Sequence, residues 1–189
     1  MSRIAGVTDT NPTHALVQRA FARDEGRAGK VLQVTRAGAL VPEAYDAWAH
    51  MYDTVQSLNA VPVEIKQLAT LLVYMRVGCL MCLDFATATA RMKGVTEEKL
   101  EALSHYKTSS LFSTEERAVL RLAEAMTRAP AVVADEDFEA LKKFYDDTQL
   151  MELVFHISVM NMGGRMGRGL EFVPEGFSEG QFCIVPTRE

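Results

Sequence analysis

Apolar residues recur along this chain at spacings of three and four, the pattern of helices that bury one face. Pro42 suits the first position of a helix, which Asn59 closes. Its apolar positions are Tyr45, Trp48, Ala49, Tyr52 and Val55. A second helix, from Pro62 to about Arg76, is apolar around much of its circumference, so we expect it at the centre of the molecule. No strand pattern accompanies these helices, and the chain is predicted to be all-α.

Capping residues mark further helices. Ser113 and Glu116 form a capping box for a helix from Thr114 to about Arg128, and Thr96 caps one over 97–103.

The pattern is weaker elsewhere. A first helix is predicted to begin after Thr13 and to end near Gly26, because glycine is unfavourable inside helices. Asp135 is expected to cap a helix reaching Tyr145, and a long apolar helix covers 150–162. Residues 30–40 are ambiguous, since 31–34 could be a short extended piece.

A weak internal repeat relates 64–81 to 149–166 at a constant offset. It aligns Leu68 with Leu153 and Gly78 with Gly163. This suggests a duplicated helix-break-helix unit in which only the first copy has cysteines.

The length predicts one helical domain over 1–189, with its core at about 40–170. Residues 1–12 are predicted to form an N-terminal arm. The C-terminal arm, 171–189, carries three phenylalanines and is expected to pack on this subunit or on a neighbour.

Composition excludes several protein classes. An apolar content of 48% with 24% charged residues is typical of a globular protein. The net charge of −5 argues against nucleic-acid binding, which needs a basic patch. The longest apolar run is far too short for a membrane span, and the N-terminus lacks the apolar stretch of a signal peptide. A cytoplasmic location is therefore expected.

The strongest chemical signal is the pair Cys79 and Cys82, which follows Gly78. If a helix begins near Cys79, both sulfurs lie on one face of its first turn, where the helix dipole stabilises a thiolate. Such a pair can cycle between dithiol and disulfide. Two alternatives remain open: two buried core cysteines, or part of a zinc site. Zinc would need two more ligands, and the histidines show no paired spacing, so no metal or cofactor is expected.

The other candidates have structural interpretations. His156 lies within the apolar last helix and is interpreted as a buried histidine bonded to a carbonyl, while His50 and His105 are interpreted as solvated. Cys183 is interpreted as a lone packed thiol. The glycine-rich run 163–169 follows a helix rather than a strand, so helix termination and close packing are favoured over phosphate binding.

Residues 67–86 resemble the alkylhydroperoxidase D / carboxymuconolactone decarboxylase family, particularly its peroxidase-related branch. The resemblance lies in Arg76-Val77-Gly78-Cys79 and Cys82-Leu83-Asp84-Phe85, with later matches at Phe112-Ser113 and near Asn161–Arg165. It covers about 40–170 and implies an alkylhydroperoxidase D-like helical bundle that reduces hydroperoxides or disulfides. It also implies a homo-oligomer, whether trimer, hexamer or dimer, and a thiol reductant protein as a partner.

The resemblance implies that Cys82 attacks the peroxide and that Cys79 resolves the product, although the helix-start argument favours a low pKa at Cys79. Active family members add a glutamate and a histidine that relay protons. Gln67 and Ala86 occupy those two positions, so both relay residues are missing. Gln67 can only donate or accept a hydrogen bond, and Glu64 and Asp84 are the candidate substitutes.

Two hypotheses follow from this pattern. In the first, the protein is a thiol oxidoreductase of the alkylhydroperoxidase type, weakened by the loss of the relay. In the second, it is a non-catalytic helical oligomer that binds a small ligand or senses oxidants.

Overall fold

The computed structural model describes residues 2–179, and within them every regular element is a helix. The helices are α1 (Ala15–Ala28), α2 (Gln33–Gly38), α3 (Pro42–Ser57), α4 (Val63–Val77), α5 (Leu80–Met92), α6 (Glu97–Ala102), the 3-10 turn η1 (Leu103–His105), α7 (Thr114–Thr127), α8 (Asp135–Leu141) and α9 (Asp147–Gly169). The all-α prediction is confirmed. No helix in this part of the chain is long and apolar enough to cross a membrane.

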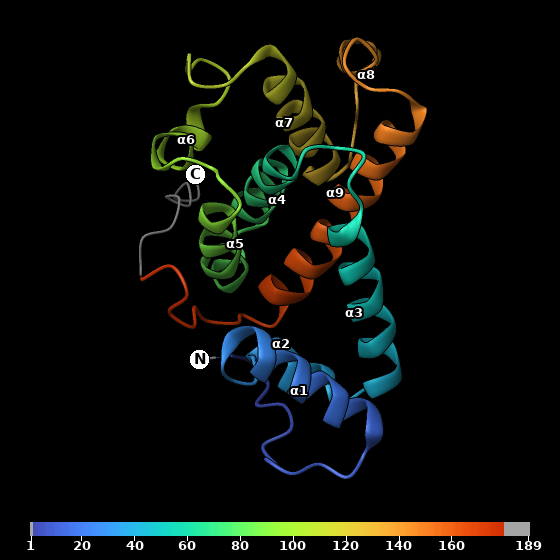
Figure 1. The fold of residues 1–189 in the computed structure, drawn as a ribbon, viewed down its shortest axis with the longest axis vertical. Helices are drawn as coiled ribbons and strands as arrows, with labels where there is room; N and C mark the ends of the chain where they lie inside the picture. Colours follow the sequence, from blue (N-terminus) through green and yellow to red (C-terminus); the bar gives the residue numbers. More distant parts are fainter. Residues whose placement is uncertain (1, 180–189) are drawn as a thin grey trace.

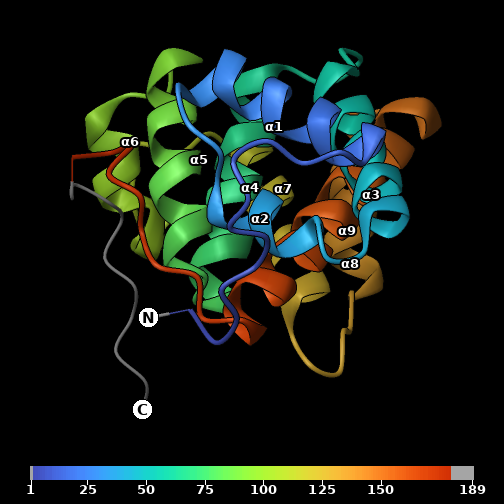
Figure 2. The same cartoon turned by 90° about the horizontal axis from the view of Figure 1, so that it is seen from below.

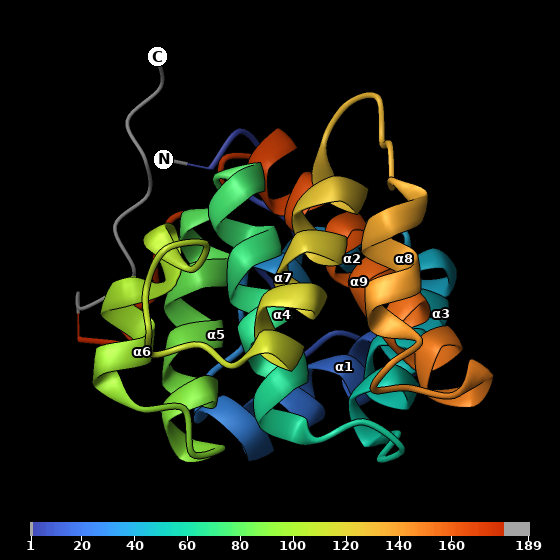
Figure 3. The same ribbon diagram turned by 90° about the horizontal axis from the view of Figure 1, so that it is seen from above.

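Helix α4 lies at the centre of the bundle, as predicted (Figure 1). Every side chain from Ile65 to Met75 is buried, and α4 packs mainly against α5, α7 and α9. Figure 3 shows α4 running between α5 and α7. A helix that is apolar on nearly all sides needs neighbours on all sides, and this requirement places α4 in the core.

Two helix boundaries in the first forty residues differ from the prediction. Helix α1 continues past Gly26 and ends at Ala28, where Gly29 adopts the left-handed conformation with φ 69°. The ambiguous segment 31–34 divides at Leu32, which is extended (φ −76°, ψ 154°), because residues 33–38 form α2. Thr35 and Ala37 of α2 are buried, and packing against α1 and α3 outweighs the weak local preference.

Two boundaries in the last third were also predicted wrongly. Asp135 is the first residue of α8 rather than its cap, and α8 ends at Leu141. Helix α9 starts at a capping box formed by Asp146 and Gln149, and it runs well beyond the expected end to Gly169. Its glycines do not terminate it, and the second copy of the proposed repeat therefore lacks the break seen after α4.

Buried polar contacts join α4 to α9 at a constant sequence separation. Lys66 Nζ lies 2.9 Å from Glu152 Oε1, and Thr70 Oγ1 lies 2.7 Å from His156 Nε2. The Tyr74 hydroxyl donates to Met160 Sδ at 3.2 Å. A constant separation means that the two helices run parallel and in fixed register, so the repeated segments lie side by side.

His156 is fully buried, as expected, and its Nε2 lies 2.7 Å from the Thr70 hydroxyl. Burial, and then the positive charge of Lys66, lower the pKa of His156 to about 4. The imidazole is therefore neutral in the folded protein at neutral pH.

We expect this histidine to make the protein acid-sensitive. Its pKa in the unfolded chain is about 6.5, so the unfolded state binds more protons between that value and about 4. The neutral imidazole therefore contributes fully to the free energy of unfolding above pH 6.5. This contribution, about 3 kcal/mol in total, is lost as the pH falls through 4. Urea unfolding across pH 4–7 measures it. His156→Gln should flatten the profile, while the exposed His105→Gln should not; identical profiles would contradict the expectation.

Both terminal segments lie against the bundle. In the N-terminal arm, the amides of Arg3 and Val7 donate to the carbonyls of Leu170 and Arg36 at 2.9 and 2.8 Å. Figure 2 shows this arm on the same face as the described part of the C-terminal arm, residues 171–179. Cys183 and the rest of that arm lie outside the described residues.

Candidate functional site

Cys79 and Cys82 lie where α4 ends and α5 begins, as the sequence predicted. Gly78 takes the left-handed conformation with φ 77° that ends α4. Cys79 is the N-cap of α5, and its Sγ accepts a hydrogen bond from the Cys82 amide at 3.3 Å. The two sulfurs form a disulfide with an S–S distance of 2.04 Å. The two sulfurs are therefore placed within bonding distance of each other.

Three glycines of α9 allow the helix to approach this site closely. A Cβ atom at Gly167 would lie 2.5 Å from Cys79 Sγ and 3.0 Å from Cys82 Sγ. At Gly163 it would lie 3.2 Å from the Trp48 ring, and at Gly164 it would lie 3.0 Å from the Tyr74 ring. The predicted close packing of this glycine run is confirmed, but it occurs within a helix.

A cavity of about 90 Å³ adjoins the disulfide. Its apolar wall combines aromatic and sulfur-containing side chains from α3, α4 and α5: Trp48, Tyr52, Tyr74, Met81, Cys82 and Phe85. Its other wall comes from α1 and the chain after it: Arg23, Asp24, Arg27, Ala28, Leu32 and Val34. Tyr45 and Gly163 complete the lining.

The two sulfurs differ in their access to this cavity. Cys82 lines it and is 8% exposed, whereas Cys79 does not line it and is 1% exposed. Both lie in the first turn of α5, where unpaired amides and the helix dipole favour a thiolate. The geometry therefore favours Cys82 as the sulfur that meets a molecule in the cavity.

Gln67 and Ala86, where the resemblance places a glutamate and a histidine, are both buried. Gln67 lies within α4 and Ala86 within α5, and neither lines the cavity. Glu64, a candidate substitute, is exposed and approaches Gly94, just past the far end of α5. With a helical rise of about 1.5 Å per residue, that is on the order of 20 Å from Cys79. Glu64 therefore does not reach the sulfurs.

Asp84, the other candidate substitute, is fully buried and already bonded elsewhere. Its carboxylate accepts hydrogen bonds from four consecutive backbone amides, at residues 175–178, and from the Ser178 hydroxyl, at distances of 2.7–3.1 Å. Burial alone would raise the pKa of Asp84, but these hydrogen bonds, led by those from Ser178, lower it. A carboxylate with five donors is poorly suited to accept a proton from a thiol, so the structure gives Asp84 an anchoring role.

Tyrosines supply the hydroxyl groups around the cavity. Burial raises the pKa of Tyr45 to about 12 and holds the pKa of Tyr74 well above its ordinary value. Both phenols therefore stay protonated at neutral pH and can donate hydrogen bonds, but they cannot act as bases.

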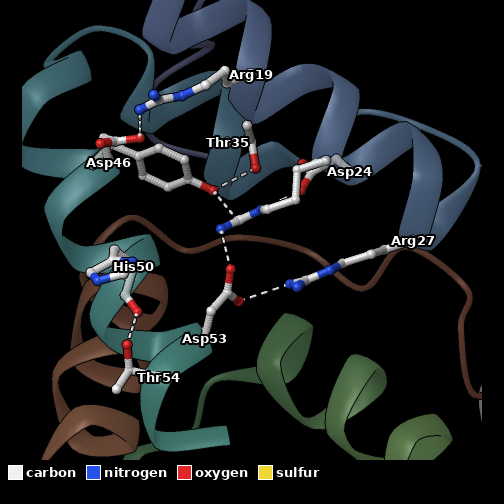
Figure 4. A network of polar contacts seen from close by, with 10 residues as sticks. Arg19, Asp24, Arg27, Thr35, Asp46, His50, Asp53 and Thr54 are labelled. Carbon is white, nitrogen blue, oxygen red and sulfur yellow. Dashed lines mark hydrogen bonds and ion pairs between the residues drawn. The ribbon is translucent and has the colours of Figure 1, made fainter. Parts of the chain in front are cut away.

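Charged residues at the α1 side of the cavity are paired with one another. Arg27 lies 2.8 Å from Asp53, and Arg23 lies 3.5 Å from Asp53 and 3.8 Å from Asp24. Figure 4 shows Arg27 directed at Asp53, with Asp24 and Thr35 nearby. Two cations thus face two carboxylates.

Sequence reasoning found the cysteines and allowed for a ligand site beside them, but it did not identify the residues that line the cavity. The aromatic residues Trp48, Tyr52 and Tyr74 were visible only as apolar positions of α3 and α4. Nothing in the local pattern of α1 marks Arg23 or Asp24 as neighbours of Cys82. The one available signal was the concentration of aromatic residues in α3.

The former zinc alternative finds no support in the described residues. Among residues 2–179 there is no group of three or more His, Cys, Asp or Glu arranged to hold a metal ion. Glu152, the repeat counterpart of Gln67, instead pairs with Lys66 and accepts from the amides of Ala60 and Val61.

Residues 42–125 match the carboxymuconolactone decarboxylase family. The chain is 34% identical over 90 residues to an uncharacterized protein of Bacillus subtilis, YdfG, and this match covers 47% of the chain and 61% of that relative. The chain therefore spans about three fifths of that relative's length.

Two solved structures share the fold. An uncharacterized peroxidase-related protein from Silicibacter sp. TM1040 matches with a TM-score of 0.78 and 23% identity over 92% of each chain. The debrominase Bmp8, in complex with 2,3,4-tribromopyrrole, matches with a TM-score of 0.81 and 19% identity over 95% of this chain and 96% of the other. At these identities the likeness concerns the fold alone.

Proposed function

We propose that the protein is a dithiol reductase of small hydroperoxides, and the match of residues 42–125 to the carboxymuconolactone decarboxylase family supports this proposal. The observation that carries the proposal is the position of Cys82, which lines a cavity and can form a disulfide with Cys79. A nucleophile beside a cavity, with a second thiol within bonding distance, is the arrangement that two-step peroxide reduction requires.

In the first step, the Cys82 thiolate attacks the outer peroxide oxygen and the O–O bond breaks. Cys82 becomes a sulfenic acid, and the leaving alkoxide takes a proton to become an alcohol. In the second step, Cys79 attacks the Cys82 sulfur, the S–O bond breaks, and water leaves as the disulfide forms. A dithiol reductant, such as a reductant protein, restores the two thiols.

Proton transfer is the weak point of this site. Without the glutamate and histidine of the relay, we expect turnover slower by a factor of about 10² to 10⁴ than with full acid–base help. The N-terminal dipole of α5 partly compensates by favouring the thiolate.

The test is a thiol titration. The chain has three cysteines, so the reduced protein has three thiols. One equivalent of tert-butyl hydroperoxide should remove two of them, and dithiothreitol should restore both. A titre that stays at three would reject the proposal and favour the non-catalytic alternative, in which the cavity only binds a small ligand.

Reductive dehalogenation is a second candidate, because Trp48, Tyr52, Tyr74 and Phe85 give the cavity aromatic walls. In that reaction an aryl bromide and two thiols would give the arene, hydrogen bromide and the disulfide. The cavity, at about 90 Å³, is smaller than a cavity of about 150 Å³ that holds benzene. Size therefore favours a hydroperoxide that is smaller than an aryl bromide.

We further propose that the protein is a homo-oligomer. Met151, Phe155 and Met162 are exposed along α9, as are Leu40 and Val41 between α2 and α3. Apolar side chains gathered on a helix face are typical of subunit contacts. Light scattering on the purified protein would show a monomer mass if this proposal is wrong.

A further inference from the structure

The size and walls of the cavity restrict what can reach Cys82. Its volume of about 90 Å³ suits a compact branched alkyl group better than a substituted ring. Around Cys82 the wall consists of the rings of Trp48, Tyr74 and Phe85 and the Met81 thioether. Such rigid aromatic walls bind apolar groups well, but they adapt little to larger ones.

The two arginines at the cavity's other end are paired with carboxylates, although Arg23 Nε is buried without a hydrogen-bond partner. Arg27 and Arg23 both contact Asp53, and Arg23 also faces Asp24. Asp24 is buried and also accepts a hydrogen bond from the Leu32 amide at 3.0 Å. Asp24 and Asp53 already balance the charge of both arginines, so a carboxylate entering the cavity would lose its hydration in exchange for one unpartnered N–H of Arg23, which is unfavourable.

One wall of the cavity is supported by the C-terminal strap, residues 173–178. Asp84 holds the strap through five hydrogen bonds to residues 175–178. Lys30 adds a hydrogen bond to the Glu175 carbonyl at 2.7 Å, and the Gln33 amide donates to the Glu175 carboxylate at 3.0 Å. The strap is therefore fixed between α5 and the chain before α2.

The strap reaches the cavity through two phenylalanines. Phe177 of the strap packs edge-on against Phe85, with 5.4 Å between ring centroids, and Phe85 lines the cavity. Lys30 Nζ lies 4.8 Å from the centroid of the Phe177 ring. Phe85 cannot move outward while Phe177 is held in place, so the latch at Asp84 fixes the wall beside Cys82.

We infer that the Cys82 cavity admits compact, uncharged substrates, and that Asp84 is a positioning residue that sets this limit by latching the strap behind Phe85. The inference rests on the proposed function for its chemistry, but the size limit is a property of the cavity alone. Asp84 acts through Phe177 and Phe85 and takes no proton from the thiols.

The experiment compares three oxidants on the reduced protein: tert-butyl hydroperoxide, the bulkier cumene hydroperoxide and the anionic monoperoxysuccinate. Each rate of disulfide formation is divided by the rate with free cysteine. The unaltered protein should favour tert-butyl hydroperoxide over both others by on the order of tenfold. In Asp84→Ala the ratio of the rate with tert-butyl hydroperoxide to the rate with cumene hydroperoxide should fall towards one. Ser178→Ala, which removes one of the five donors, should give an intermediate ratio.

Asp135→Ala, an exposed aspartate-to-alanine change in α8, is the matched control and should leave the ratio unchanged. Trp48 is the only tryptophan and lines the cavity, so its quenching by acrylamide reports access without any turnover. Quenching should increase in Asp84→Ala. If that variant does not fold, Ser178→Ala and Phe177→Leu provide the same comparison.

The outcomes separate this inference from the proposed function. If no hydroperoxide oxidises the thiols, the proposed function fails. The size limit can still be tested by comparing the affinities of tert-butanol and cumyl alcohol, each measured by the change in Trp48 fluorescence. Equal rates with all three oxidants, or unchanged selectivity and unchanged quenching in Asp84→Ala, would overturn the inference.

Discussion

Cys82→Ser is expected to abolish hydroperoxide reduction by the protein, so that only the background rate measured without protein is left. A serine hydroxyl is not ionised at neutral pH and cannot accept the peroxide oxygen as a thiolate does. Cys82 lines the cavity and Cys79 does not, so Cys79 does not replace Cys82 there. Stopped-flow consumption of tert-butyl hydroperoxide by the reduced protein measures the effect.

Cys79→Ser separates the two steps of the reaction. This variant should still react once, but it should stop at the sulfenic acid of Cys82, which dimedone traps and mass spectrometry detects. Cys183→Ser is the control and should behave as the unaltered protein. Peroxide consumption by Cys82→Ser at the parental rate would show that the sulfur roles are reversed or that the pair is inert.

Gly167→Ala is expected to destabilise the oxidised protein by about 1–3 kcal/mol. The added Cβ would lie 2.5 Å from Cys79 Sγ and 3.0 Å from Cys82 Sγ, so either α9 or the disulfide must shift. Helix propensity works in the opposite direction, since alanine is favoured over glycine by about 1 kcal/mol. The net loss should therefore be larger in the oxidised than in the reduced protein, as measured by urea unfolding of both forms.

Gly26→Ala is the matched control for this change. Gly26 lies inside α1, and a Cβ added there meets no atom within 4 Å. Gly26→Ala should gain the stabilisation that comes from the higher helix propensity of alanine, without a steric clash. It should therefore be slightly more stable than the unaltered protein. Equal stability changes at Gly26 and Gly167 would mean that α9 does not press on the disulfide.

The fold class followed from the sequence because helices are specified by local signals. The capping box of Ser113 and Glu116 forms as predicted, and Pro42 occupies the first position of α3. Gly78 ends α4 and Cys79 caps α5, so the position of the chemical motif was also predictable. Each of these features depends on contacts within about one helical turn.

Errors arose where a helix is maintained by contacts with distant segments. Helix α9 continues through Gly163, Gly164 and Gly167 because those glycines allow close contact with α3, α4 and the disulfide. Local propensity favours an end there, but the packing of α9 against these neighbours outweighs it. Helix α2 formed against its ambiguous local pattern for a similar reason.

The sequence by itself determined that this chain is helical and that its credible chemistry lies at Cys79 and Cys82. Its resemblance to the family also implied that Gln67 and Ala86 occupy the positions of a proton relay. Only the tertiary structure decided which sulfur faces a cavity and what Asp84 does. A strap about ninety residues further along the chain supplies all five donors to that carboxylate. Burial and hydrogen-bond partners depend on which segments pack against each other, and the spacing of residues along the chain does not specify these tertiary contacts.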